Sequence, residues 1–195
     1  MAFRDFTFPD VCHKLGLTQR QASLYPDVPP LDPGRDFLSR MALGARLGLA
    51  INTEKARSEF MIAPVLAEVY RHLDARFALF SGVEFNVDPA RGLNGFCDFL
   101  FTRSPYQFDV TAPVIAIAVA KNDNIRNGLG QCVAEMVAAR EFNADGTVVH
   151  GVVTTGTSWK FLRLAGNDLT LDDREYLVIE SPAILGVLAH ILETA

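Results

Sequence analysis

The chain has 195 residues, of which 49% are hydrophobic and 21% are charged, and its formal net charge is −5. This composition is that of a soluble globular domain with a sizeable core, and the acidic balance argues against a broad basic surface for gripping nucleic acid. No apolar run is long enough to cross a bilayer, and the opening stretch MAFRDFTFPD lacks the apolar region of a signal peptide. We therefore expect a cytoplasmic protein.

The three cysteines, Cys12, Cys97 and Cys132, are far apart and odd in number. This number and spacing match neither a disulfide framework nor a zinc site. We therefore expect three reduced thiols in the core. The four histidines are also scattered, so no histidine-based metal site is expected.

The first part of the chain, residues 1–33, is expected to form an irregular N-terminal arm and a proline-rich linker. The stretch YPDVPPLDPG holds four prolines, and proline fixes φ and lacks a backbone donor. Neither a helix nor a central strand is expected there. The main domain is placed at residues 34–195.

Two helices are expected at the start of the main domain. The apolar spacing is helical from Arg35 to Leu49, and a second helical stripe follows with Asn52 or Thr53 as its N-cap. Pro64 lies inside the second segment and should kink it or divide it in two.

Three strands and a helix are predicted next. The strands are placed at Phe77–Asp88, Phe96–Thr102 and Val114–Lys121, and the third is an unbroken apolar run that ends on a lysine. A helix is predicted to begin in NDNIRNGLGQ, because the apolar residues from there on recur in steps of three and one. It should end near Phe142.

The last part of the chain is predicted to hold consecutive strands and a final helix. The β-rich runs of TVVHGVVTTGTSWKFLRLAGNDLTL are split by TTGT and AGND, which is typical of strands joined by tight turns. A short amphipathic helix is expected at Pro182–Leu192. The whole order of elements predicts a mixed α/β (α+β) domain with one central sheet flanked by helices.

Two charged residues on these strands mark a candidate site. Asp98 lies inside an apolar strand, where a carboxylate is costly unless it is paired or bound to a metal. Lys121 ends the next strand. Hydrolysis of a phosphodiester with a divalent metal needs oxygen ligands and a cation near the attacking water, which such residues can supply. The structural alternative is a salt bridge between Asp98 and Lys121.

The order and spacing of these motifs resemble the PD-(D/E)-X-K, or restriction-endonuclease-like, superfamily. The matching residues are Glu59 on a helix ahead of the strands, Asp98 in GFCDFLF, Lys121 in VIAIAVAKND and Gln131 in GLGQCVAEM. KARSEFMIAPVLAEV and GVVTTGTSWKFLRL also resemble a helix and a hairpin of the N-terminal nuclease domain of type I restriction subunits. The resemblance covers about residues 53–164 and extends to a group of uncharacterised, largely cyanobacterial proteins related to that domain.

The resemblance implies a restriction-endonuclease-like domain with an N-terminal extension. It implies a catalytic site made of Asp98, Lys121, Glu59 and Gln131, with Mg²⁺ or Mn²⁺ as the cofactor. Asp98 and Glu59, with Glu84 as a further candidate, would bind the metal. The partner implied is DNA, no membrane partner is expected, and assembly into a homo-oligomer is left open.

The chain departs from the superfamily pattern at one position. Where the pattern has acid-X-Lys, this sequence has Val119 two residues before Lys121, and valine cannot bind a metal. The missing acid could come from Glu59, Glu84 or Asp123. Two functions are therefore weighed: a metal-dependent DNA hydrolase or a catalytically degraded homologue of one, and a non-catalytic module that binds nucleic acid or a protein.

Each residue also has a plain structural interpretation. Lys121 could be a solvated strand end, Glu59 an exposed helix acid, and Gln131 a partner of the backbone. Nucleic acid would bind weakly to so acidic a chain unless arginines gather around one groove. The arginines that flank the proposed site elements are Arg57, Arg103, Arg126 and Arg140.

Overall fold

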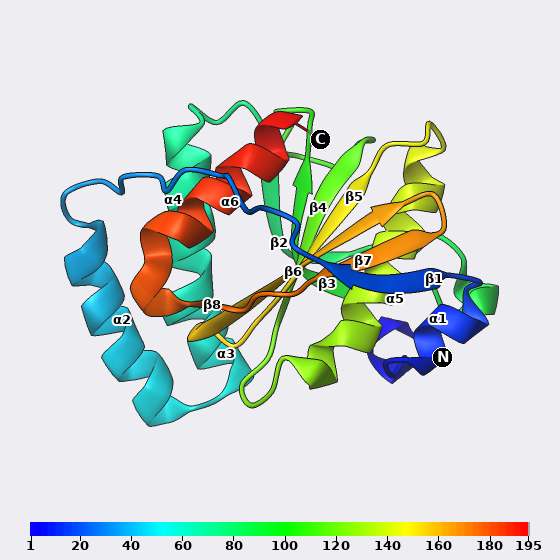
Figure 1. Ribbon diagram of the computed structural model, residues 1–195, viewed down its shortest axis with the longest axis horizontal. Helices are drawn as coiled ribbons and strands as arrows, with labels where there is room; N and C mark the ends of the chain where they lie inside the picture. The colour runs from blue at the N-terminus through cyan, green and yellow to red at the C-terminus, as the bar shows by residue number, and fades with distance from the viewer. Residues whose placement is uncertain (195) are drawn as a thin grey trace.

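A mixed β-sheet occupies the centre of the computed structural model, which describes residues 1–194 (Figure 1). Its strands are β1 (Thr18–Ala22), β2 (Ala78–Glu84), β3 (Phe96–Thr102), β4 (Val114–Ala120), β5 (Val149–Thr154), β6 (Ser158–Ala165), β7 (Asp168–Asp172) and β8 (Tyr176–Leu177). The order across the eight-stranded sheet is β1-β7-β6-β5-β4-β3-β2, and β8 pairs with β6. The mixed α/β fold expected from the sequence is confirmed.

Helices cover both faces of the sheet. They are α1 (Asp10–Lys14), α2 (Phe37–Ile51), α3 (Glu54–Arg57), α4 (Ala63–His72), α5 (Arg126–Asn143) and α6 (Ser181–Thr194). Short 3-10 turns lie at Phe3–Asp5, Pro89–Arg91 and Val178–Glu180. Figure 1 shows α2, α4 and α6 on one side of the sheet, and α1 and α5 on the other. Each side has its own apolar core, with Val133 of α5 in one and Leu188 of α6 in the other.

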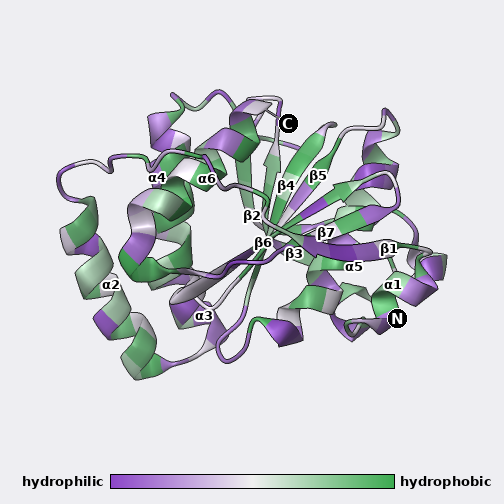
Figure 2. Cartoon of the chain, viewed as in Figure 1, coloured by the Kyte–Doolittle hydropathy of each residue, from purple (hydrophilic) through white to green (hydrophobic). Residues whose placement is uncertain are grey.

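Four neighbouring strands form the part of the sheet that carries the candidate site. β2, β3 and β4 pair antiparallel in chain order, and β5 pairs parallel with β4 after the crossover through α5. Every residue of β4 and of β5 is buried. Strands that are covered on both faces have continuous apolar sequences, which explains VIAIAVA and the green of β4 and β5 in Figure 2.

The N-terminal arm is more regular than the sequence predicted. Residues 1–22 form a 3-10 turn, α1 and strand β1, and Phe3 and Phe6 are buried in the core beneath α5. The close approach needs Gly130, because a Cβ there would lie 2.2 Å from the carbonyl oxygen of Phe6. β1 was missed because all five of its side chains are polar or small and exposed, so backbone pairing with β7 supports it. The proline-rich stretch after β1 has neither helix nor strand, as predicted.

The predicted division of the second helical segment is confirmed. Thr53 is the N-cap of α3, and its hydroxyl accepts a hydrogen bond from the amide of Ala56 at 3.1 Å. A π-helical turn at Ser58–Ile62 separates α3 from α4, and Pro64 lies in the first turn of α4, where its missing N–H costs little. The predicted reduced cysteines are also confirmed, since Cys12, Cys97 and Cys132 are free and buried.

Candidate functional site

Asp98 lies on β3, between the edge strand β2 and β4. Its Oδ2 accepts a hydrogen bond of 2.8 Å from the amide of Ala120, at the end of β4. Burial raises the pKa of the Asp98 carboxyl, while this hydrogen bond and the charge of Lys121 lower it. The antiparallel register pairs Phe99 with Ala118, so one further step places Asp98 opposite Val119.

Lys121 is fixed by contacts at both ends. Its backbone amide donates to the carbonyl of Thr154 at 2.8 Å, which continues the β4–β5 pairing by one residue. Its Nζ donates to Oε1 of Gln131 at 3.1 Å and lies 3.4 Å from Oε2 of Glu54. The side chain is only 14% exposed. Lys121 therefore joins the end of β4 to α3 and to α5.

Glu135 is the deepest charged residue of the site. It lies one turn after Gln131 on α5, and its Oε1 accepts a 2.9 Å hydrogen bond from Nε2 of Gln131. The side chain is fully buried, and Oε2 has no hydrogen-bond partner among the described residues. Burial is the largest cause that raises the pKa of Glu135 to about 8, and the charge of the neighbouring Asp98 adds to it. Gln131, Lys121 and Cys97 act in the opposite direction and lower this pKa.

These residues form one connected group, here called the Asp98 site: Asp98, Glu54, Lys121, Gln131 and Glu135. Hydrogen bonds and an ion pair join Glu54, Lys121, Gln131 and Glu135 in sequence, and Asp98 acts on Lys121 and Glu135 through its charge. Within residues 1–194 no three His, Cys, Asp or Glu side chains are arranged to enclose a metal ion. Mg²⁺ is usually held by one or two carboxylates, with water and substrate phosphate as its other ligands.

Three of the predicted site residues come together, namely Asp98, Lys121 and Gln131. The expected ion pair between Asp98 and Lys121 is wrong, because the two form no contact within ion-pair distance in the described chain. Asp98 bonds to a backbone amide instead, and the ammonium of Lys121 lies against Glu54. Gln131 bonds to side chains, not to the backbone.

The other predicted acids have partners of their own. Glu59 is half exposed, and its Oε1 lies 2.7 Å from Nζ of Lys55, so nothing in the structure joins it to Asp98. Glu84 is exposed and accepts from the side chain of Asn86 at 2.9 Å. Asp123 accepts from the amide of Asn124 and the side chain of Asn127, at the start of α5.

Sequence reasoning missed Glu54 and Glu135. Glu54 directly follows the N-cap residue Thr53, so its place in the first turn of a helix could be recognised from the sequence. Glu135 was detectable as a lone acid three residues after Cys132 on the apolar face of a helix, and four residues after Gln131. Val119 is fully buried in the core beneath α5, the helix that carries Glu135.

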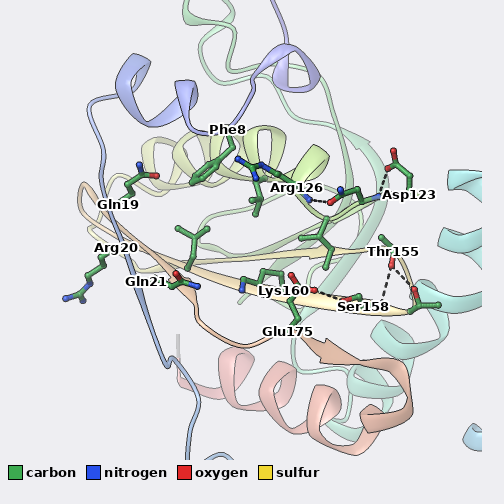
Figure 3. Close-up of a pocket in the computed structure, with 15 residues that line it drawn as sticks. Phe8, Gln19, Arg20, Gln21, Asp123, Arg126, Thr155, Ser158, Lys160 and Glu175 are labelled. Carbon is green, nitrogen blue, oxygen red and sulfur yellow. Dashed lines mark hydrogen bonds between the residues drawn. The ribbon is translucent and has the colours of Figure 1, made fainter.

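A large pocket of about 800 Å³ opens beside the Asp98 site. It is lined by the β5–β6 turn, the N-terminal turn of α5, Phe8, and the exposed strand β1. Figure 3 shows Gln19 and Gln21 at one end, and Thr155 and Asp123 at the other. The carbonyl of Thr155 accepts from Arg57 at 2.8 Å, which ties this end of the pocket to α3.

The sequence matches no protein-family model and no curated protein. Across residues 1–194 the structure has no helix with the length and apolar character needed to cross a bilayer.

Proposed function

We propose that this protein is a metal-dependent DNA hydrolase in which α5 supplies the acid that β4 lacks. The observation that carries the proposal is the carboxyl of Glu135, which is fully buried, has one oxygen without a partner, and lies beside Asp98. A buried carboxyl that is left incompletely bonded destabilises the fold. Groups with strongly shifted pKa values tend to gather at functional sites.

The arrangement of the strands also supports the proposal. Asp98 is on the middle strand of the β2-β3-β4 group, Lys121 follows the third strand, and Gln131 is on the helix that leads to the parallel strand β5. This is the order of elements and motif residues that the resemblance to the PD-(D/E)-X-K superfamily implies. Val119 packs beneath α5, so an acid on that helix can serve in place of one on the strand.

The residues of the site suit a hard divalent cation such as Mg²⁺ or Mn²⁺. Asp98 and Glu135 would hold it, since both offer oxygen atoms and Oε2 of Glu135 is uncommitted. When bound, such a cation would polarise the scissile phosphate and lower the pKa of an attacking water. Glu135 must first release its proton, so binding of the cation should strengthen as the pH rises toward about 8.

Each of the other residues would have a separate task. Lys121 would orient the attacking water or the phosphate with its ammonium group. Glu54 and Gln131 hold that ammonium in place, and Gln131 also fixes the orientation of the Glu135 carboxyl. The positions of Asp98 and Lys121 are further set by backbone bonds at the end of β4.

A non-catalytic binding module is the second candidate, and one observation favours it. Asp98 already bonds to the amide of Ala120, and Lys121 already has two partners, so both are accommodated without a metal. A module of this kind would keep Glu135 protonated at neutral pH and would need no cation.

Metal binding and cleavage should be measured on the same four proteins: the wild type, Asp98→Asn, Glu135→Gln and, as a control, Glu68→Gln, which changes a buried glutamate on the other face of the sheet. We expect Mn²⁺ and Mg²⁺ to raise the melting temperature of the wild type and the control, because a hundredfold excess over Kd adds about 2.7 kcal/mol to the free energy of unfolding. The same two proteins should cleave plasmid or single-stranded DNA. Metal stabilisation that is equal in all four proteins, or a wild type that neither responds to metal nor cleaves, would reject the hydrolase in favour of the binding module.

A further inference from the structure

The pocket beside the Asp98 site contains two cations that the fold does not use. Arg126 lies on the α5 side and Lys160 on the sheet side (Figure 3). Neither side chain forms a hydrogen bond or an ion pair within the described chain. Arg126 is exposed and Lys160 half-buried, so each can meet a ligand from solvent.

The two acids that line the pocket, Asp123 and Glu175, accept hydrogen bonds from neutral groups of the chain. The carboxylate of Asp123 accepts hydrogen bonds from the amide of Asn124 at 2.6 Å and from the side chain of Asn127 at 3.0 Å. Oε2 of Glu175 accepts from the hydroxyl of Ser158 at 3.0 Å. These bonds hold the two carboxylates in place but leave them charged. The lining also carries three cations, Arg20, Arg126 and Lys160, so cations outnumber acids in the pocket although the chain as a whole is acidic.

The remaining walls combine an apolar surface with free amides. Phe8, Leu129 and Leu171 contribute apolar side chains to the wall. Gln19 and Gln21 project from β1, and their amide groups have no partners among residues 1–194. An amide both donates and accepts, which suits the edge of a nucleobase.

From these features we infer that the pocket binds a nucleotide, with its phosphate at Arg126 and Lys160 and its base against Phe8, Leu129 and Leu171. The nucleotide could be free or part of a strand, and the chemistry of recognition is the same. In a strand it would lie close to the Asp98 site, because Lys121 bonds to Thr154, next to Thr155 in the wall of the pocket. This role in substrate recognition rests on the proposed function, whereas the binding itself does not.

Binding should be measured in chelator, so that hydrolysis cannot contribute. The probes are a fluorescent single-stranded oligonucleotide and a fluorescent mononucleotide, and the readout is anisotropy. Lys160→Ala should weaken oligonucleotide binding about tenfold, a loss of about 1.4 kcal/mol. Gln19→Ala, on an exposed strand that tolerates the change, should weaken it less. The control Lys55→Ala removes a lysine of α3 that does not line the pocket.

The outcomes separate the two proposals. Binding of the oligonucleotide alone identifies a strand as the ligand, and binding of the mononucleotide identifies a free nucleotide. The inference is overturned if the wild type binds neither probe, or if Lys55→Ala weakens binding as much as Lys160→Ala. Glu68→Gln, on the other face of the sheet, should bind as the wild type does. A protein that binds in this pattern but never cleaves contradicts only the hydrolase.

Discussion

Two buried glutamates lie on opposite faces of the sheet and have opposite electrostatics. Glu68 on α4 is 3% exposed and Glu135 on α5 is 0% exposed. Glu68 accepts from the amide of Gly34 at 2.8 Å and from Arg71 at 2.7 Å, and the Arg71 hydrogen bond is the largest cause that lowers its pKa. Glu135 has one amide donor, and burial raises its pKa to about 8.

The difference shows that burial alone does not decide whether the charged form of an acid is favoured. Glu68 on α4 accepts a hydrogen bond from Gly34, which holds the end of the proline-rich linker against this helix. Ion pairs with Arg40 and Arg71 balance its charge. Oε2 of Glu135 has no hydrogen-bond partner within residues 1–194, so the charged form of this carboxyl is disfavoured. The number of partners, not the depth, is what separates the two residues.

The largest expected effect is on catalysis. Glu135→Gln should reduce cleavage of DNA by about 100-fold or more, because a lost metal ligand costs several kcal/mol in the transition state. Glu68→Gln should leave the rate per folded molecule unchanged. Single-turnover cleavage of plasmid by both variants measures the contrast, and equal rates would remove the functional distinction between the two acids.

The pH dependence of stability should differ in sign between the two acids. Because the pKa of Glu135 rises from 4.5 in the unfolded chain to about 8 in the fold, its stabilising contribution is complete below pH 4.5 and is lost as the pH rises to about 8. The slope is up to about 1.4 kcal/mol per pH unit within this window. Glu68, whose pKa is lowered, contributes stability above pH 4.5 that is lost on acidification.

Urea unfolding in chelator at several pH values measures both slopes. The decline of stability between pH 5 and 8 should be absent in Glu135→Gln and present in Glu68→Gln, which makes each variant the control for the other. A wild type and a Glu135→Gln variant with parallel profiles would mean that Glu135 titrates normally.

A smaller effect is expected on stability at fixed pH. Glu68→Gln should lower the free energy of unfolding by about 1–2 kcal/mol at pH 7, because hydrogen bonds to a charged group are lost while both arginine partners are largely exposed. Glu135→Gln should be neutral or stabilising in chelator. Chemical denaturation at pH 7 tests this, and the reverse order of stabilities would contradict the comparison.

The smallest effect is expected at Glu59. Its partner Lys55 is 82% exposed, and such surface pairs contribute less than about 1 kcal/mol. Glu59→Gln should therefore change neither the melting temperature nor the cleavage rate by a measurable amount. If Glu59→Gln abolished cleavage as Glu135→Gln is expected to, the site would have to include the residue that the superfamily resemblance first indicated.

Most of the fold was predictable because its strands and helices bury periodic apolar residues. β3 was predicted at its observed bounds, and β4 within one residue, since apolar runs that end on polar residues define a buried strand. β1 was not predictable in this way. Its sequence TQRQA has no apolar alternation, and it is a strand only because β7 offers backbone partners.

The site was predictable in part for a similar reason. Asp98 and Lys121 stand out locally, as an acid inside an apolar strand and a lysine at the end of another. Glu135 stands on a helix whose face was interpreted as apolar, and its importance depends on how α5 packs over Val119. The contact of Glu54 with Lys121 joins residues 67 positions apart, so no local pattern encodes it.

The pairing of β1 with β7 sets an order of events during synthesis. Arg20 and Thr170, which face each other across this pair, are 150 residues apart. The arm is synthesised before β7, so it can join the sheet only after β7 has emerged from the ribosome. Until then the core that encloses Phe3 and Phe6 is incomplete, so these side chains add exposed apolar surface to the nascent chain. Such transiently exposed apolar surface is what chaperones shield, so the late completion of the sheet makes this chain a candidate for their assistance.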